Sequence, residues 1–420
     1  MMRGLRIAVV GSAVAVALLA PAGAGAHPGL RGDAPPPSTS TSTLPSGATA
    51  RLDAALLEAW AGLPGGALAT VIVPGRGRWV GSVGYGNEQR GRPLVPAMQS
   101  PIGSVTKTFT AMLVLQETER GEGAARAGSS ATGISLDDRL DRWYPWIPLA
   151  DEITVAMLLN MSSGIADYLN GDIVGTAEEL LADPKRRYRP DDLIAKGAAM
   201  PRAFEVPGSG FASSNTNTVI LGQILEKETG TAYADLLRER LFGPLGLSRT
   251  FLDISGRLRA PHAQTYSEVY ALAPSGPRVG LTTDWSQSIV WAAGGLASTI
   301  DNLGRWGRTF GTGRGAISAS LAADRLDDCA PMMQDPSITV EYCLGVAVVR
   351  DTDSGKPITL WHNGRVFGAV AYLGYYPATG AVVAVMANSD LSGPDGEPVS
   401  MRGKAAIEAA VPGLLGLSRS

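Results

Sequence analysis

Ser104 and Lys107 stand three residues apart at the start of an apolar run, within residues 101–110. Residues at that spacing share one face of a helix, so the lysine amine can reach the serine hydroxyl. A hydroxyl with an amine beside it is a nucleophile paired with a base. The same spacing also occurs on solvated helix surfaces, so an ordinary surface pair is the alternative.

The scarcity of lysine favours the chemical interpretation. The chain has six lysines, and only Lys107 has a serine three residues before it. Most residues around it are apolar, which predicts a helix buried on several sides: Phe109, Ala111, Met112, Leu113 and Leu115. Burial favours the neutral form of a lysine amine, which is the form that can act as a base.

Two later polar segments could complete a site. Ser213 and Asn215 follow the Pro/Gly-rich stretch 207–210 and precede a predicted helix, where serine and asparagine are also ordinary capping residues. His362 and Gly364 fall on or at the end of a predicted strand, where a structural histidine and a bulge are the alternatives. A triad built on His262 has weaker support, because residues 260–263 are predicted to be a loop.

The predicted elements place strands at both ends of the chain and helices between them. A helix at 51–63 and a hairpin at 67–73 and 78–85 precede the Ser104 segment, and residues 136–252 are mainly helical in pattern. Late strands and a last helix are predicted at 337–349, 357–361, 366–375, 381–388 and 400–410. We therefore predict an α+β fold, with an antiparallel sheet built from both chain ends, flanked by helices, and an inserted all-helical lobe.

Composition limits the classes of partner. The chain is 45% hydrophobic and long enough for one large domain or two lobes, and its net charge of -3 gives no indication of nucleic-acid binding. No His/Cys cluster has metal-ligand spacing, so we expect no metal and no cofactor. Cys329 and Cys343 are expected to form a disulfide in an exported protein, with two separate thiols as the alternative.

The N-terminal residues predict export. Residues 1–26 have the basic start, apolar run and small-residue end of a secretory signal peptide, and an uncleaved anchor is the alternative. The Pro/Ser/Thr-rich stretch 27–50 is predicted to be a disordered spacer, and 51–420 a serine hydrolase domain. We expect a secreted, extracellular protein that meets the membrane only transiently, through this signal.

The order of the three motifs resembles that of the serine β-lactamase/DD-peptidase superfamily, in particular its DD-carboxypeptidase and class C β-lactamase-like branch. The likeness runs from residue 52 to the C-terminus and includes 102–107, 214–217, 293–296 and 362–364. It implies a β-lactamase/transpeptidase-like fold in which the three motifs line one cleft.

The resemblance also implies roles for individual residues. Ser104 would form an acyl-enzyme with Lys107 as its base, and the backbone N–H groups of Ser104 and Arg365 would hold the oxyanion. Asn215 would orient the substrate or Lys107, and His362 would form a polar wall. The substrate-binding residues on the late strand would be Asn363, Gly364 and Arg365.

The chain departs from the family pattern at two points. Ser213 stands where the carboxypeptidase branch usually has a tyrosine, so we expect Ser213 to relay a proton through Lys107 instead. Ala347 stands where an arginine for the substrate carboxylate is expected. Arg365 is the first candidate to replace that arginine by a bidentate contact, and Arg350 is a more distant one.

We therefore expect a monomeric D-alanyl-D-alanine carboxypeptidase-like serine hydrolase that acts on D-amino-acid peptides, such as cell-wall stem peptides. The alternatives are an esterase, amidase or β-lactamase-like hydrolase of small acyl substrates, and a catalytically silent protein that binds peptidoglycan or β-lactams.

Overall fold

The computed structural model describes residues 36–126, 133–267, 269, 280–391 and 399–417. The predicted signal peptide, 1–26, and the first part of the predicted spacer lie outside these residues. Among the helices described, none combines the length and the apolarity that crossing a membrane requires.

The strands, in chain order, are β1 (Ser38–Ser42), β2 (Gly66–Val73), β3 (Gly77–Asn87), β4 (Arg92–Pro93), β5 (Ser100–Pro101), β6 (Phe251–Leu252), β7 (Tyr266–Ser267), β8 (Gly280–Leu281), β9 (Leu296–Ser298), β10 (Ala330–Gln334), β11 (Ile338–Cys343), β12 (Val346–Asp351), β13 (Pro357–Val366), β14 (Ala369–Tyr376) and β15 (Ala381–Ala387). The α-helices are α1 (Ser46–Ala59), α2 (Thr106–Arg126), α3 (Val155–Leu159), α4 (Ile173–Ala182), α5 (Pro190–Ala199), α6 (Asn215–Thr229), α7 (Tyr233–Leu237), α8 (Trp291–Gly294), α9 (Ile300–Thr312), α10 (Ala319–Asp324), α11 (Val399–Ala410) and α12 (Pro412–Leu415).

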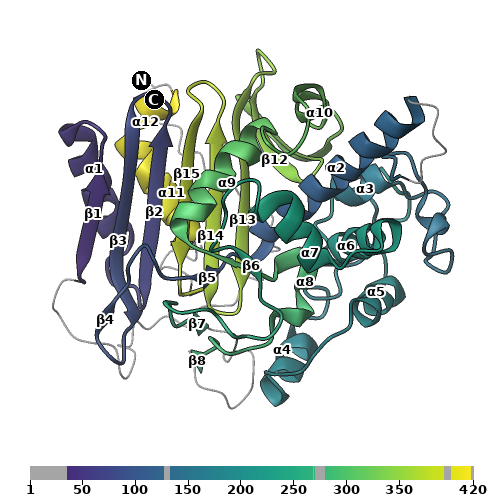
Figure 1. Ribbon diagram of the computed structural model, residues 1–420, viewed down its shortest axis with the longest axis horizontal. Helices are drawn as coiled ribbons and strands as arrows, with labels where there is room; N and C mark the ends of the chain where they lie inside the picture. The colour runs from purple at the N-terminus through teal and green to yellow at the C-terminus, as the bar shows by residue number, and fades with distance from the viewer. Residues whose placement is uncertain (1–35, 127–132, 268, 270–279, 392–398, 418–420) are drawn as a thin grey trace.

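An antiparallel sheet forms the left part of the molecule in Figure 1, in the order β1-β3-β2-β15-β14-β13-β12-β11-β10. Its two chain ends meet where β2 pairs with β15, in a register that runs from Ala67 opposite Ala387 to Ile72 opposite Val382. The α+β class, the antiparallel sheet and its assembly from both chain ends are therefore confirmed. One predicted run, 337–349, is a hairpin of two strands, because Gly345 turns the chain with φ +75°.

Helices cover both faces of the central strands, and successive side chains of a strand point to opposite sides. On β15, Val383 and Val385 belong to the apolar cluster that contains residues of α1 and α11. Val382 and Ala384 belong to the other cluster, which includes α9 and the helical lobe. The helices α3, α5, α6 and α7 lie to the right of the sheet in Figure 1, and α2 runs toward them.

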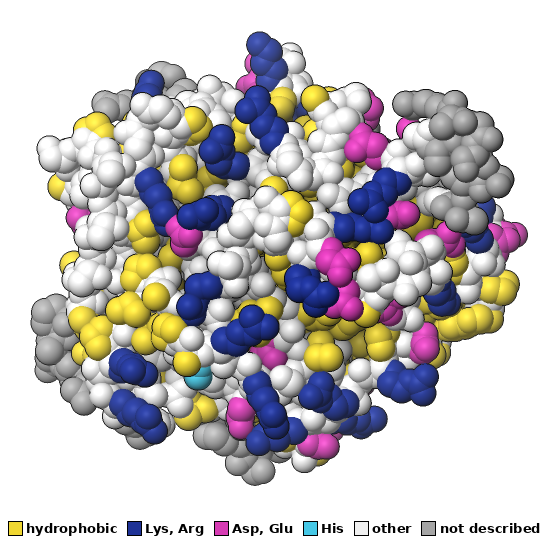
Figure 2. All heavy atoms as spheres, viewed as in Figure 1, with side chains coloured by type: hydrophobic (Ala, Val, Ile, Leu, Met, Phe, Trp, Pro, Cys, Tyr) yellow, Lys and Arg dark blue, Asp and Glu magenta, His cyan; other side chains and the backbone are white. Residues whose placement is uncertain are grey.

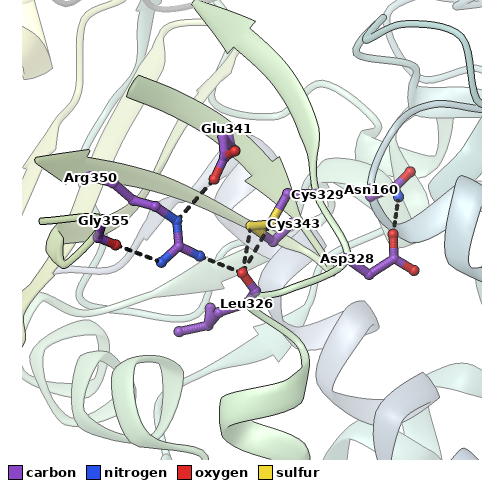
Figure 3. Close-up of a disulfide and its surroundings, with 8 residues drawn as sticks. All are labelled: Asn160, Leu326, Asp328, Cys329, Glu341, Cys343, Arg350 and Gly355. Atoms are coloured by element: carbon purple, nitrogen blue, oxygen red, sulfur yellow. Dashed lines mark hydrogen bonds and ion pairs between the residues drawn. A yellow bond between two sulfur atoms is a disulfide. The ribbon is translucent and has the colours of Figure 1, made fainter. Parts of the chain in front are cut away.

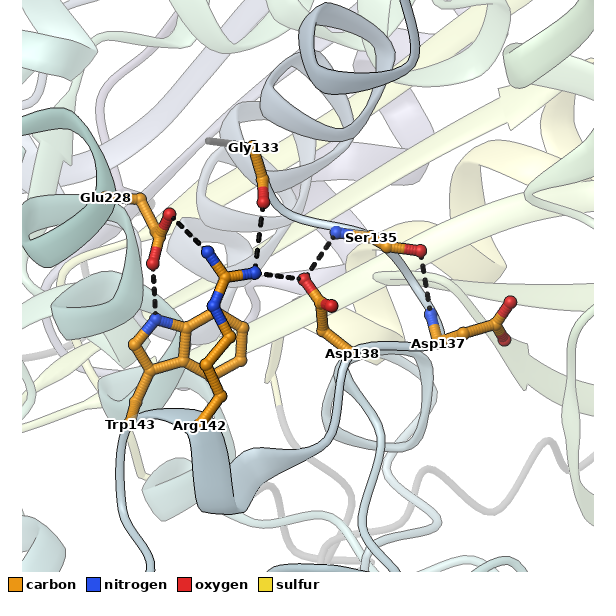
Figure 4. Close-up of polar contacts among 7 residues, drawn as sticks. All are labelled: Gly133, Ser135, Asp137, Asp138, Arg142, Trp143 and Glu228. Atoms are coloured by element: carbon orange, nitrogen blue, oxygen red, sulfur yellow. Dashed lines mark hydrogen bonds and ion pairs between the residues drawn. The ribbon is translucent and has the colours of Figure 1, made fainter. Parts of the chain in front are cut away.

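A cluster of surface ion pairs secures the start of the helical lobe (Figure 4). Arg142 donates to Asp138 at 2.7 Å and to Glu228 at 2.8 Å, and it also donates to the Gly133 carbonyl at 3.2 Å. The Trp143 indole donates to the second oxygen of Glu228 at 2.6 Å. These contacts fasten the loop after α2 to the C-terminal end of α6, whose first residue is the predicted site residue Asn215.

The predicted spacer 27–50 is wrong in its described part. Ser38–Ser42 pairs with β3 from Ser38 opposite Val83 to Ser42 opposite Trp79, and α1 already begins at Ser46. Every β1 side chain is exposed, which is why the composition of this stretch is typical of a disordered spacer. The backbone is ordered because the free edge of β3 offers hydrogen bonds that no local pattern reveals.

Helix α9 lies against the sheet, and its residue Trp306 packs on α2. Trp306 is fully buried, its ring stacks on Phe109 at a centroid distance of 3.8 Å, and its indole N–H donates to Thr108 Oγ1 at 2.9 Å. Both partners lie in the first turns of α2, next to Lys107. The packing of α9 therefore supports the helix that carries the candidate base.

We expect Trp306→Ala to lower the free energy of unfolding by about 3–5 kcal/mol, because it removes a fully buried ring and leaves a cavity. Trp146→Ala is the matched control, since that ring is 55% exposed and its loss should cost less than about 0.5 kcal/mol. Chemical denaturation followed by circular dichroism measures both values. Equal stabilities for the two variants would contradict the role of Trp306.

Candidate active site

Ser104 lies in a 3₁₀ turn, Gly103–Val105, that leads directly into α2. The segment before it is held by β9, because Ile102 N–H donates to the Leu296 carbonyl at 2.9 Å. Leu296 N–H in turn donates to Thr106 Oγ1 at 3.1 Å. Ser104 is half-buried, so its hydroxyl is accessible while its backbone is fixed on both sides.

Strand β13 packs against this turn with no room for side chains between the two backbones. A Cβ on Gly364 would lie 2.1 Å from the Ile102 carbonyl oxygen and 2.8 Å from Ser104 N. A Cβ on Gly103, whose φ is +51°, would lie 2.7 Å from Arg365 N. Both glycines are required by close approach, and the alternative of a bulge at Gly364 is wrong, because Gly364 pairs with Ala371 in regular register.

The edge of β13 that faces the turn is not covered by β12, because the pairing of these two strands ends early. β12 pairs with β13 only as far as Ala347 opposite Trp361, while β14 continues to Val366 opposite Ala369. Residues 362–366 therefore pair on one side only. The backbone nitrogens of Ser104 and Arg365, the predicted oxyanion donors, both border this narrow contact.

The Lys107 amine is buried, with 4% of the residue exposed, and makes three hydrogen bonds. Lys107 Nζ lies 2.9 Å from Ser104 Oγ, 2.6 Å from Asn215 Oδ1 and 2.9 Å from the Ala293 carbonyl oxygen. The structure thus brings together Ser104 from the 3₁₀ turn, Lys107 from the first turn of α2 and Asn215 from α6. The carbonyl of Ala293, at the end of α8, is a partner that the sequence interpretation did not assign.

These partners decide where the lone pair of a neutral amine points. The amide oxygen of Asn215 and the carbonyl of Ala293 can only accept, so they take the two N–H groups. The lone pair then faces Ser104 Oγ, the one partner with a proton to donate. Burial lowers the pKa of Lys107 to about 8, against an opposing rise from the carboxylate of Asp167, so the neutral form is accessible near neutral pH.

His362 is buried and neutral. Its Nδ1–H donates to the Asn363 carbonyl at 2.6 Å, so Nε2 is the acceptor for the Tyr342 hydroxyl at 2.9 Å. Burial and the nearby Lys107 amine lower the pKa of His362 to about 3. His362 therefore forms an uncharged wall. Tyr342 was missed at the sequence level because a tyrosine in an apolar strand is an ordinary core residue.

Ser213 does not reach the amine. Its side chain is exposed, and among the described residues it hydrogen-bonds neither Ser104 nor Lys107. The neighbouring Ser214 is the N-cap residue of α6, but its hydroxyl donates to the Ala166 carbonyl at 3.1 Å instead of capping the helix. The structure therefore offers no contact for the relay predicted at Ser213.

The candidates for binding a carboxylate are reduced to one. Ala347 is buried in the sheet, opposite Trp361. Arg350 is bound to Glu341 at 2.9 Å and to the carbonyl of Leu326, beside the disulfide in Figure 3. Arg350 is thus a structural residue, and the prediction of a substrate role for it has no support. Arg365 remains, with half of its side chain exposed and Nε 3.9 Å from Asp390.

The predicted disulfide is present. Cys329, just before β10, is bonded to Cys343 at the end of β11, next to Tyr342. Asn160 donates to the adjacent Asp328 at 2.8 Å, which ties the helical lobe to the same corner (Figure 3). The two sulfurs and a Glu341 carboxylate oxygen lie within 4.8 Å of one another, but sulfurs in a disulfide are not the thiolates that bind metals.

A cavity of about 660 Å³ lies elsewhere and contains none of the eight predicted site residues. Of its three arginines, Arg78, Arg249 and Arg305, the first and the last are paired with Asp301, at 2.5 Å and 2.9 Å. On the face shown in Figure 2, basic and acidic side chains are interspersed and form no single stripe. The cavity therefore does not compete with the Ser104 site for the chemistry.

The fold and the serine–lysine geometry define the β-lactamase/transpeptidase-like superfamily. The family model described as Beta-lactamase matches residues 52–406, and the chain belongs to this family.

Individual relatives are similar over shorter stretches. Penicillin-binding protein 4* of Bacillus subtilis is 29% identical over 169 residues, which are 40% of this chain and 34% of that protein. A D-aminopeptidase of Cereibacter sphaeroides is 32% identical over 186 residues, 44% of this chain and 32% of that protein. The chain thus spans about a third of these curated relatives. The crystal structure of a D-stereospecific amidohydrolase from Streptomyces sp. has a TM-score of 0.70 and 27% identity, covering 87% of this chain and 99% of that one.

Gly364→Ala should reduce acylation of Ser104 by about 100-fold or more, because the added methyl group forces β13 away from the turn and displaces an oxyanion donor. Gly123→Ala is the control, since nothing lies within 4 Å of its added Cβ and the residue is in helix α2. Gly123→Ala should be as active as the wild type. Stopped-flow acylation measures both rates, and an unimpaired Gly364→Ala would contradict the close-contact interpretation.

The rate of acylation should rise with pH and reach half of its plateau near pH 8, the pKa of Lys107. Below that pH the amine carries a proton and cannot accept another, whereas above it the lone pair is available. Lys107→Arg should abolish the reaction, because a guanidinium stays protonated. A rate that is independent of pH between 6 and 9 would exclude Lys107 as the base.

Proposed function

We propose that this protein is a secreted serine hydrolase that forms an acyl-enzyme at Ser104 with D-amino-acid peptides or amides. The observation that carries the proposal is the 2.9 Å contact between Lys107 Nζ and Ser104 Oγ, with the other two amine partners being acceptors only. A serine hydroxyl needs a neutral base beside it, and this arrangement supplies one.

In the first half-reaction Ser104 Oγ forms a bond to the substrate carbonyl carbon, and its proton passes to Lys107 Nζ. The carbonyl electron pair moves to oxygen, where the backbone N–H groups of Ser104 and Arg365 stabilise it. The C–N bond of the substrate then breaks, and the leaving amine takes the proton from Lys107. Lys107 returns to its neutral form and Ser104 is left acylated.

In the second half-reaction water attacks the ester carbon and gives a proton to Lys107. The Ser104 Oγ–acyl bond breaks, Oγ regains a proton from Lys107, and the acid is released. No charged histidine takes part, because His362 stays neutral through the pH range in which Lys107 titrates. We expect His362, held by Tyr342, to contact the substrate as an uncharged polar side chain and to orient it.

The relatives support a D-amino-acid substrate class, since one is named a D-aminopeptidase and another a D-stereospecific amidohydrolase. Two kinds of enzyme would fit this substrate class. A D-alanyl-D-alanine carboxypeptidase would use Arg365 to bind the terminal carboxylate of a peptide such as a cell-wall stem. An aminopeptidase or amidase would need no such ligand, and the apolar Ala347 and the occupied Arg350 favour it.

We further propose export through residues 1–26, with a monomeric enzyme acting outside the cell. The disulfide between Cys329 and Cys343 supports an oxidising compartment. A catalytically silent binding protein is the second candidate function, and the exposed Ser213 at the usual tyrosine position favours it. The intact contact between Lys107 and Ser104 favours the enzyme.

Ser104 should become covalently acylated by a p-nitrophenyl ester of acetyl-D-alanine and by a cephalosporin. The intact protein mass should rise by the mass of one acyl group. Ser104→Ala should show no adduct, whereas Ser354→Ala, in an exposed turn, should react like the wild type. A folded wild-type protein that neither gains mass nor turns over either reagent would disprove the acyl-enzyme and support a binding protein.

Product analysis then separates the versions of the enzyme. Release of D-alanine from a diacyl-Lys-D-Ala-D-Ala peptide identifies a carboxypeptidase, and loss of that activity in Arg365→Ala would assign the carboxylate contact. Hydrolysis of D-alanine amide, with the L-enantiomer as control, identifies an amidase. Turnover of the ester alone identifies an esterase.

A further inference from the structure

Asp167 lies outside the three predicted motifs, in the loop between α3 and α4, yet its carboxylate contacts one of them. Its Oδ1 and Oδ2 atoms lie 3.1 Å and 3.0 Å from Asn215 Nδ2. On the other side of the same amide, Asn215 Oδ1 accepts from Lys107 Nζ at 2.6 Å. The Asp167 carboxylate is therefore connected to the Lys107 amine through the side-chain amide of Asn215, by two successive hydrogen-bonding contacts.

The loop holds this carboxylate in place. Leu169 N–H donates to Asp167 Oδ1 at 3.0 Å, and Asn170 Nδ2 donates to Oδ2 at 2.6 Å. The preceding carbonyl, that of Ala166, accepts from Thr216 Oγ1 at 2.6 Å, which clamps the loop to the first turn of α6. Asp167 and Asn215 consequently keep a fixed relative position.

We propose that Asp167 is a positioning residue that acts on Lys107 through Asn215. A carboxylate can only accept, so it binds the NH₂ group of the Asn215 amide and turns the amide oxygen toward the amine. That oxygen takes one amine N–H and leaves the lone pair directed at Ser104. The inference rests on the function proposed above for the Ser104–Lys107 pair.

Asp167 also acts by its charge. Among the described residues, the hydrogen-bond partners of Lys107 are uncharged: the Ser104 hydroxyl, the Asn215 amide and the Ala293 carbonyl. His362 on β13 is neutral, and the first turn of α2 has no acidic residue. Burial lowers the pKa of Lys107, and the Asp167 carboxylate opposes that effect. Removing the carboxylate should therefore lower the pKa of Lys107 further.

Asp167→Asn tests both effects. The pH at which acylation of Ser104 is half-maximal should move down by about one unit, because the opposing negative charge is lost. The plateau rate should fall by about tenfold, the equivalent of one hydrogen bond that held the amide. Asp167→Glu, which retains the charge, should move the pH dependence back toward that of the wild type.

Asp172→Asn is the matched control. Asp172 lies at the end of the same loop and caps α4, with Oδ1 accepting from Gly175 N–H at 3.0 Å. This variant should retain nearly the wild-type stability, because asparagine caps a helix about as well as aspartate, and it should retain the wild-type pH dependence. If Asp167→Asn behaves like Asp172→Asn in both pH dependence and plateau rate, Asp167 has only a structural role and the inference is wrong.

A direct titration separates this inference from the proposed function. The chain has six lysines, so protein labelled with ¹³C at lysine Cε gives few signals, and Lys107→Arg identifies that of Lys107. The pKa of Lys107 should be about one unit lower in Asp167→Asn than in the wild type. A wild type that is never acylated refutes the proposed function, whereas an unchanged Lys107 titration refutes the role of Asp167.

Discussion

A buried amine with a complete set of partners is the constraint on which the rest of this structure depends. A lysine ammonium is costly to bury unless its N–H groups are bonded, and the partners of Lys107 come from three parts of the chain. Asn215 is 108 residues from Lys107 in sequence and Ala293 is 186 residues away. The helical lobe and the segment around α8 must therefore both be in place before the amine is satisfied.

A second constraint is the direct contact of two backbones at Ser104. Gly103 and Gly364 allow β13 to lie against the 3₁₀ turn, so that amide nitrogens from two distant segments border one space. The short pairing of β12 keeps this edge of β13 open. The disulfide and the Arg350 contacts stabilise the neighbouring hairpin (Figure 3), which explains why that arginine is unavailable to a substrate.

The charge distribution of the site follows from these two constraints. His362 and the Tyr342 hydroxyl form a neutral wall, so the proton equilibria of the site centre on Lys107. Burial alone would favour a neutral amine strongly, and Asp167 limits that shift. As a result, Lys107 is a base that is neither permanently charged nor too weak to accept a proton.

The sequence alone determined the local features of this protein. The contact between Ser104 and Lys107, the hairpin before them and the α+β order of elements all follow from patterns within a few residues, and the structure confirms each of them. Ser104 itself lies in the 3₁₀ turn that leads into the helix of Lys107. Tertiary structure decided what depends on distant contacts. These are the pairing of β1 with the edge of β3, and the placement of Asp167 and Tyr342 beside the site. Helical and strand periodicity specify neighbours three or two positions away, whereas a carboxylate 48 residues from Asn215 is brought to it only by the packing of a loop on α6.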